Sequence, residues 1–366
     1  MRGLLERIFP ATDWELHWGT DSLSSAADMN RTSPHLAIVG ATGAVGREML
    51  RCLKEQKVPY GKLTLLASAR SAGQELEFGG ERLVVDELTE QSFEGVDIAL
   101  FAAGGGISTR FAPIATAAGA LVIDNSSAFR MDDQVPLIVP EINPNAVKDV
   151  SKGIIANPNC TTIISLMALA PLHRAFGLKA VIASSYQAVS GSGAAGITEL
   201  DEQLKVLVNG GEIVKEVYPH QIASNVIPHV DVFLEGGYTK EEQKMLFESR
   251  KILAQPDLKV TTTCVRVPVM RSHSVSISAQ FEQPVSVEKA QAVYGDATPG
   301  IRLCDDPQAE LYPTPLDTTN KDDCLVGRMR MDQVLENALA LWVVGDQVKK
   351  GAALNAVQIA SLVLSQ

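Results

Sequence analysis

The sequence is short of positive charge, since its 366 residues include 32 lysines and arginines against 43 aspartates and glutamates. The formal net charge is therefore −11. A protein that binds nucleic acid through the phosphates needs a basic face, so we expect no nucleic-acid partner. Hydrophobic residues make up 46% and charged residues 20% of the chain. This composition argues against disorder, collagen and coiled coils, and the length predicts about two globular domains.

Cysteine is scarce as well, and the sequence has no long apolar run. The five cysteines lie far apart without a Cys-x-x-Cys pair, which indicates neither a disulfide framework nor a metal site. They are Cys52, Cys160, Cys264, Cys304 and Cys324. This usage is typical of a reducing compartment and predicts a cytoplasmic protein. No apolar run approaches the ~18 residues of a membrane-spanning helix, so we expect no membrane association.

The first 33 residues differ in character from the rest. They hold two of the three tryptophans and are rich in acidic residues. A secretory signal needs a continuous apolar segment and an organellar transit peptide is poor in acid, so neither fits. We expect residues 1–33 to be a disordered or loosely attached extension. Alternatively, translation starts at Met29, which N-terminal mass spectrometry would decide.

From His35 onward, short apolar strands alternate with amphipathic helices. The strands are expected at 36–39, 63–66, 96–101 and 121–123. Strands that are separated by helices and apolar on both faces are typical of a doubly wound parallel sheet. The pattern therefore predicts an α/β, Rossmann-like domain over residues 34–159.

The pattern changes after residue 159 and predicts a second, α+β domain over residues 160–344. Helices are expected at 163–172 and 196–208, and strands of a mixed or antiparallel sheet at 180–185, 260–267 and 275–281. The stretch 351–364 is amphipathic and helical. We expect it to return to the first domain, so that residues 345–366 complete that domain.

A glycine-rich turn, Gly40-Ala41-Thr42-Gly43-Ala44-Val45-Gly46, joins the first predicted strand to its helix. Glycines let the backbone approach an anionic diphosphate, and the free N–H groups of a helix start favour negative charge. A packing turn without a ligand is the alternative. The position between a strand and a helix favours a dinucleotide site.

The second predicted strand runs into Ala67-Ser68-Ala69-Arg70-Ser71. An NAD-specific fold normally has an Asp or Glu here, which holds the ribose 2′-hydroxyl. This segment has no carboxylate, and Arg70 with Ser71 suits a 2′-phosphate. Although Arg70 could be an ordinary surface cation, the pattern favours NADP over NAD.

A polar turn, Asn-Pro-Asn-Cys-Thr-Thr at 157–162, precedes a predicted helix. A cysteine at a helix start has its thiolate stabilised by the helix dipole, so Cys160 is expected to have a lowered pKa. The other cysteines lack such a setting. His273 is the candidate acid/base. Three further histidines, His173, His220 and His229, are not excluded by spacing.

Seven motifs in this order resemble the aspartate-semialdehyde dehydrogenase family, and they cover nearly all of the chain from His35 onward. They are the glycine turn at 40–46, Ala-Ser-Ala-Arg-Ser-Ala-Gly at 67–73, Asp-Asn-Ser-Ser-Ala-Phe-Arg at 124–130, Asn-Pro-Asn-Cys-Thr-Thr at 157–162, Ser-Tyr-Gln-Ala-Val-Ser-Gly-Ser-Gly at 185–193, Arg-Val-Pro-Val-Met-Arg-Ser-His at 266–273, and Gly-Asp-Gln-Val-Lys-Lys-Gly-Ala-Ala at 345–353. The resemblance implies NADP-dependent reductive dephosphorylation of L-aspartyl 4-phosphate to aspartate semialdehyde. This reaction leads toward lysine, methionine and threonine.

The resemblance also implies roles for individual residues. Cys160 would form a thioester with the acyl group, His273 would act as acid/base, and Gln187 would orient the acyl group. The substrate-binding residues would be Arg130 and Lys244 for phosphate, Arg266 for the α-carboxylate, Glu241 for the ammonium group, and Asn159. An exposed helix pair of Glu241 and Lys244 is the alternative. Glu242 is a second choice for Glu241. Arg271 is expected to be structural, although its nearness to His273 leaves a role in the site open.

The cofactor-binding residues implied by the resemblance come from both predicted domains. They are Gly40, Thr42, Gly43, Ala44, Val45, Arg70, Ser71, Ser190, Gly191 and Gln347. The cofactor NADP would therefore lie between the domains, beyond the carboxyl ends of the strands. Since the cofactor and the substrate are both anions, Arg70, Arg130, Lys244 and Arg266 would have to form a local positive cleft in an acidic protein.

Other assignments remain open at this point. Glyceraldehyde-3-phosphate dehydrogenases and N-acetylglutamyl-phosphate reductases also form a thioester on cysteine. Arg266, seven residues before His273, and the segment 124–130 favour the aspartyl substrate. A non-catalytic NADP-binding regulator is a more distant alternative. The resemblance further implies a homodimer or homotetramer.

Overall fold

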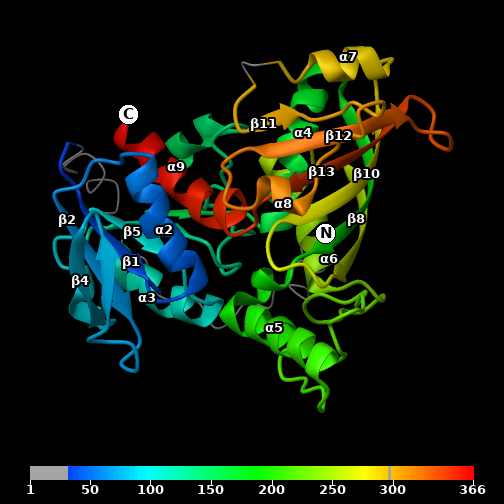
Figure 1. Cartoon of the computed structure of the whole chain (residues 1–366). Helices are drawn as coiled ribbons and strands as arrows, with labels where there is room; N and C mark the ends of the chain where they lie inside the picture. Colours follow the sequence, from blue (N-terminus) through cyan, green and yellow to red (C-terminus); the bar gives the residue numbers. More distant parts are fainter. Residues whose placement is uncertain (1–31, 296–297) are drawn as a thin grey trace.

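The computed structural model describes residues 32–295 and 298–366 (Figure 1). The predicted extension, apart from Thr32 and Ser33, and the alternative start at Met29 lie outside the described residues. The first sheet has seven strands in the order β3-β4-β2-β1-β5-β6-β7. Its strands are β1 (His35–Val39), β2 (Lys62–Ala67), β3 (Glu75–Phe78), β4 (Glu81–Glu87), β5 (Ile98–Phe101), β6 (Leu121–Asp124) and β7 (Ile154–Ala156).

Six strands of this sheet are parallel, which agrees with the predicted doubly wound sheet, but the edge strand β3 is antiparallel to β4. The hairpin β3–β4 was not predicted. Its turn is Gly79-Gly80, with φ angles of 65° and 94°. Two consecutive residues with positive φ suit the tight turn of a hairpin, and glycine adopts them without strain. The sequence signal was the alternation Glu-Leu-Glu-Phe before this glycine pair.

The helices α2 (Ala44–Glu55) and α9 (Leu354–Leu364) pack against each other, and α9 also contacts β5 and β6 (Figure 1). The last helix of the chain therefore returns to the first sheet, as predicted. It is preceded by one π-helical turn at Lys349–Ala353, where a continuous α-helix from residue 351 was expected. A further helix, α3 (Gly105–Ala117), follows β5 and packs against β6.

The second sheet has six strands in the order β11-β12-β13-β10-β8-β9 and is mixed. Its strands are β8 (Leu178–Gln187), β9 (Lys259–Arg266), β10 (His273–Phe281), β11 (Ile301–Leu303), β12 (Cys324–Met331) and β13 (Ala338–Gly345). The predicted strands correspond to β8, β9 and β10. The pair β12 and β13 was not predicted.

Three helices cover one face of the second sheet: α4 (Cys160–Phe176), α6 (Lys240–Ile252) and α7 (Val287–Ala292). The helix α4 contacts the sheet, α6 and the π-helical turn, so it is buried on nearly all sides. This explains its apolar composition. The opposite face exposes apolar side chains such as Ile182 and Tyr186. The helix α5 (Gly193–Asn209) projects from the body below this sheet (Figure 1).

The ends of several strands meet between the two sheets. The glycine turn follows β1, the segment with Arg130 follows β6, Gln187 ends β8, Arg266 ends β9, and His273 begins β10. None of the described helices is long and apolar enough to cross a membrane.

Candidate active site

Cys160 is the first residue of α4 and is partly exposed. The preceding residue, Asn159, caps the helix: its side-chain oxygen accepts hydrogen bonds from the backbone N–H groups of Thr161 (3.0 Å) and Thr162 (3.2 Å). Behind the cysteine lies Gly351 of the π-helical turn, where an added Cβ would be 2.9 Å from the Cβ of Cys160. Cys160 is therefore placed between the cap of α4 and the backbone of Gly351.

The expected low pKa of the Cys160 thiol is wrong for this structure. Burial and the charge of Glu241 raise the pKa to about 11, although Arg130, Arg266 and Lys244 act in the opposite direction. Two N–H groups at the start of α4, those of Thr161 and Thr162, already bind the oxygen of Asn159.

His273 is fully buried, and its ring is neutral at physiological pH. Its Nδ1 accepts a hydrogen bond from the backbone N–H of Ala188 (3.0 Å). Burial and, to a lesser extent, the charge of Arg266 lower the pKa of His273 to about 3. The hydrogen of the neutral ring therefore lies on Nε2, which has no hydrogen-bond partner among the described residues. This N–H is available to a ligand.

Gly191 lies directly against Arg266 and His273. An added Cβ would be 2.9 Å from a guanidinium nitrogen of Arg266 and 3.2 Å from Nε2 of His273. Arg266 also donates to the carbonyl of Ala188 (2.6 Å) and lies over the ring of Tyr218. A glycine at 191 thus lets the loop after β8 approach both side chains, and this adds a packing role to the expected cofactor contact.

Glu241 is buried in α6 and accepts hydrogen bonds from three side chains: Lys244 at 2.8 Å, Asn159 at 2.9 Å and Gln187 at 3.1 Å. Burial alone would raise its pKa, but the charge of Lys244 and these hydrogen bonds lower it to about 2. The alternative of an exposed pair is wrong, because Glu241 and Lys244 are both buried. Glu242 points elsewhere and caps α6 through the backbone N–H of Thr239.

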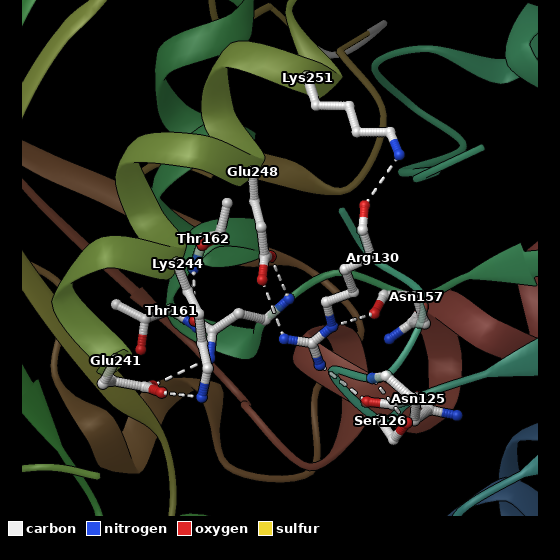
Figure 2. Close-up of polar contacts among 12 residues, drawn as sticks. Asn125, Ser126, Arg130, Asn157, Thr161, Thr162, Glu241, Lys244, Glu248 and Lys251 are labelled. Atoms are coloured by element: carbon white, nitrogen blue, oxygen red, sulfur yellow. Dashed lines mark hydrogen bonds and ion pairs between the residues drawn. The ribbon is translucent and has the colours of Figure 1, made fainter. Parts of the chain in front are cut away.

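Arg130 is buried, and three of its nitrogens are already bonded (Figure 2). Nε donates to the carbonyl of Asn157 (2.9 Å), and the two terminal nitrogens donate to Glu248 (3.0 Å) and to the carbonyl of Asn125 (2.8 Å). Lys244 donates to Asp231 (2.8 Å) in addition to Glu241. Each of these two cations is therefore paired with a buried or half-buried carboxylate.

Glu248 and Lys251 were missed in the sequence. Both leave α6 on the side that faces Arg130 (Figure 2). The positions 241, 244, 248 and 251 are separated by three, four and three residues, which places them along one face of a helix. This spacing was visible in the sequence, but nothing there indicated which segment the face meets.

The glycine turn has the geometry that a diphosphate site needs. Gly40 has a φ of 85°, and an added Cβ would lie 2.8 Å from the carbonyl oxygen of Ala102. The cap residue Gly43 has no side chain that could occupy the N–H groups at the start of α2, and the first turn has no acidic residue. Thr42, Ala44 and Val45 lie in this same turn. These groups fit an anionic dinucleotide.

The other expected cofactor residues lie at two places. Arg70 is exposed and Ser71 half-buried in the turn after β2. Ser190 accepts a hydrogen bond from the side chain of Gln347, whose oxygen in turn accepts from the backbone N–H of Ser272 (2.8 Å). The structure thus brings Ser190 and Gln347 into contact beside His273.

Arg271 joins the two halves of the site. It donates to Asp346, just before the π-helical turn (2.6 Å), and pairs with Glu48 of α2 (3.0 Å). Its role, left open by the sequence, is a link between the helix of the glycine turn and the loop that ends at His273.

The comparisons with known proteins agree with this geometry. A family model described as semialdehyde dehydrogenase, NAD binding domain, matches residues 35–150. A second model, semialdehyde dehydrogenase, dimerisation domain, matches residues 169–350. The aspartate-semialdehyde dehydrogenase of Aquifex aeolicus is 52% identical over 334 residues, which cover 90% of this chain and 98% of that protein. That of Bacillus subtilis is 48% identical over 334 residues and covers 89% of this chain and 96% of its own.

Solved structures show the same relationship. Aspartate semialdehyde dehydrogenase II from Vibrio cholerae, described as complexed with ASA, superimposes with a TM-score of 0.89 at 44% identity. The match covers 91% of this chain and 99% of that structure. The two family models, the sequence relatives and this fold therefore show that the chain belongs to the aspartate-semialdehyde dehydrogenase family.

Proposed function

We propose that this protein is the NADP-dependent enzyme that converts L-aspartyl 4-phosphate to L-aspartate 4-semialdehyde with release of phosphate, on the route to lysine, methionine and threonine. The observation that carries this proposal is the set of charged groups around Cys160. The pKa of its thiol is lowered by the charges of three cations, Arg130, Lys244 and Arg266. The charge of one carboxylate, Glu241, raises it. A substrate with a phosphate, a carboxylate and an ammonium group requires this combination of charges.

Each charged group of the substrate has a proposed partner. Arg130 and Lys244 bind the phosphate, and the planar guanidinium of Arg266 binds the α-carboxylate through two parallel hydrogen bonds. Glu241 pairs with the ammonium group, and Asn159 and Gln187, which both donate to Glu241, keep its carboxylate in place. An ammonium group beside Glu241 also weakens the charge that raises the pKa of the Cys160 thiol. Substrate binding thus favours the thiolate.

Catalysis proceeds through sulfur. The thiolate of Cys160 attacks the acyl carbon, the bond from carbon to the phosphate oxygen breaks, and phosphate leaves with the electron pair. NADPH, when bound, supplies the hydride that reduces the thioester. His273 presents its Nε2–H to the oxygen of the resulting thiohemiacetal and stabilises the negative charge there through a hydrogen bond. When the carbonyl re-forms, the carbon–sulfur bond breaks and releases the aldehyde.

Assays in the reverse direction test this proposal. The purified protein should reduce NADP with aspartate semialdehyde only when inorganic phosphate is present. It should prefer this aldehyde to glyceraldehyde 3-phosphate and to N-acetylglutamate semialdehyde. The variant Cys160→Ser should lose turnover by several orders of magnitude and still bind NADPH. A preference for a rival aldehyde contradicts the substrate, and turnover in the serine variant contradicts the nucleophile.

The choice of NADP over NAD is part of the proposal. The family model establishes a nicotinamide-nucleotide domain. Arg70 and Ser71, in a turn without a carboxylate, support recognition of a 2′-phosphate. The variant Arg70→Ala should raise the KM for NADP and leave the KM for NAD unchanged. Equal effects on both cofactors would contradict this role.

We further propose that the protein is a cytoplasmic homodimer. The dimerisation model over residues 169–350 supports an oligomer. The uncovered face of the second sheet, with Ile182 and Tyr186 exposed, supports a place for the contact. Light scattering after size-exclusion chromatography distinguishes a dimer from the alternative, a tetramer.

A further inference from the structure

Glu248 uses both of its carboxylate oxygens within the protein (Figure 2). One oxygen accepts from a terminal nitrogen of Arg130 at 3.0 Å. The other accepts from the backbone N–H of Asn159 at 2.6 Å. Its side chain is only 1% exposed. A buried carboxylate is costly unless it is paired in this way, so both contacts stabilise its charged form.

The two partners of Glu248 belong to different parts of the site. Arg130 follows β6 of the first sheet, whereas Asn159 caps α4 directly before Cys160. Glu248 itself comes from α6, which covers the second sheet. One carboxylate therefore connects the cation that faces the leaving group to the turn that carries the nucleophile.

The contact with Glu248 is one of three that hold the guanidinium of Arg130. A guanidinium has five N–H groups. Arg130 uses three nitrogens for the carbonyls of Asn157 and Asn125 and for Glu248. The carbonyl of Asn157 binds Nε, the carbonyl of Asn125 binds one terminal nitrogen, and Glu248 binds the other. Each terminal nitrogen keeps one N–H group without a partner among the described residues. The three contacts together determine where these two N–H groups point.

A neighbouring residue of α6 fixes the backbone of the same segment. The ammonium group of Lys251 donates to the carbonyls of Arg130 (2.9 Å), Asp132 (2.7 Å) and Val135 (2.8 Å). The side chain and the backbone of Arg130 are thus both held by α6, one helical turn apart (Figure 2).

We propose that Glu248 is a positioning residue that aligns Arg130 for phosphate and holds it in register with the Cys160 turn. This inference rests on the proposed function, in which Arg130 binds the phosphate group. Glu248 does not touch the substrate, because both oxygens are occupied and a carboxylate would repel phosphate. It acts through the direction that it gives to the guanidinium.

The variant Glu248→Gln tests this role with little change in shape. A glutamine offers one oxygen, so its NH₂ group must face either the guanidinium of Arg130 or the N–H of Asn159. One charge-assisted hydrogen bond is lost, and we expect the KM for inorganic phosphate to rise by about tenfold to a hundredfold. The KM for aspartate semialdehyde should change by less than about threefold, since Glu241 and Arg266 keep their contacts.

The matched control is Glu242→Gln. Glu242 lies in the same helix, is buried, and accepts from the backbone N–H groups of Thr239 (2.7 Å) and Cys264 (3.0 Å). It contacts neither Arg130 nor Asn159. This control should lower the melting temperature in a similar way and leave the KM for phosphate unchanged. If both variants raise the KM for phosphate equally, Glu248 is only structural and the proposal fails.

A double-mutant cycle identifies the path of the effect. In an Arg130→Lys background, Glu248→Gln should raise the KM for phosphate by less than about threefold, because the guanidinium that it aligns is gone. Effects that multiply would overturn the proposal. Phosphate protection of Cys160 from iodoacetamide gives the affinity for phosphate without turnover. A wild-type protein without phosphate-dependent turnover would contradict the proposed function alone, and the protection assay would still decide the role of Glu248.

Discussion

Two glycines in the site are defined by the side chains that press against them. Gly351 meets the Cα and Cβ of Cys160, and Gly191 meets Arg266 and His273. Neither glycine has a positive φ, so close approach and not backbone freedom explains the residue. The sequence shows both glycines within motifs, but it does not show their partners, because the contacts join segments that are far apart in the chain.

Adding one methyl group at position 351 should therefore displace Cys160, the proposed nucleophile. In Gly351→Ala the new Cβ would lie 2.9 Å from the Cβ and 3.2 Å from the Cα of Cys160. Overpacking of this kind costs about 1–3 kcal/mol, and we expect kcat to fall because the start of α4 must shift. Gly295→Ala is the control, since nothing lies within 4 Å of an added Cβ there. Equal kcat values for the two variants would contradict the prediction.

The pH dependence of alkylation tests the state of the thiol. Because burial and Glu241 raise the pKa of Cys160 to about 11, the thiolate fraction should grow steadily across the neutral range. The rate of reaction with iodoacetamide should then rise about tenfold per pH unit between about pH 7 and pH 10. The difference between the wild type and Cys160→Ser isolates this residue from the other four cysteines. A plateau below about pH 8 would instead support the low pKa expected from the sequence.

The helix α6 shows how far the sequence could lead at the scale of an element. The start of this helix could be predicted, because Thr239 and Glu242 have the spacing of a capping box, which the structure contains. Glu241 and Lys244 were expected from the family resemblance. The roles of Glu248 and Lys251 depend on which segment the helix face meets. That segment, around Arg130, follows β6 of the other sheet. Local patterns predict a face but not its tertiary partner.

The π-helical turn is a second element that local patterns did not predict. It spans Lys349–Ala353, between the end of β13 and α9. Turns of this kind are frequent at functional sites. Here the turn places Gly351 against Cys160, and it directs Lys350 into the interior. From the sequence alone, Lys350 would have been expected to be exposed, because lysine side chains are rarely buried.

Replacing Lys350 should destabilise the whole chain. Its ammonium group binds Glu141 (2.6 Å), Gln358 (2.8 Å) and Asn355 (2.9 Å). Lys350→Met leaves Glu141, whose side chain is 9% exposed, without its cation. Breaking a largely buried pair in this way typically costs about 3–5 kcal/mol in the free energy of unfolding. Urea unfolding measures this loss. The control Lys205→Met removes an exposed pair with Asp201 and should leave the urea midpoint unchanged. Similar midpoints for both variants would contradict the role of the buried network.

At the scale of the whole molecule, the strands β1, β2, β5 and β6 of the first sheet were predictable, because their apolar runs are continuous. The strands β8, β9 and β10 of the second sheet were predictable from β-branched residues and from alternating polar and apolar residues. The hairpin β3–β4 and the strand β12 were not, since several of their side chains face solvent. The strand β13 was missed although it is buried along nearly its whole length. The expected positive cleft is more balanced than predicted. Arg130 and Lys244 converge on Cys160, but buried carboxylates of α6 pair with both.

The same buried groups should make the folded protein sensitive to acid. The pKa of His273 is lowered to about 3 by burial. Between about pH 6.5 and pH 3 the unfolded chain therefore takes up a proton that the folded chain does not. The free energy of unfolding must fall as the pH decreases through this window. Burial would raise the pKa of Glu241, but Lys244 and the hydrogen bonds lower it to about 2. Its contribution to the free energy of unfolding is therefore also lost as the pH decreases, below about pH 4.5.

The variant His273→Asn separates the two contributions. It removes the histidine, so its free energy of unfolding should fall less steeply than that of the wild type between about pH 6.5 and pH 4.5. The expected difference in slope is about 1.4 kcal/mol per pH unit. Urea unfolding at about pH 7, 6 and 5 measures it, and the remaining histidines cancel because both proteins contain them. Parallel curves would mean that His273 takes up its proton in the folded state, and the ring would then enter catalysis charged rather than neutral.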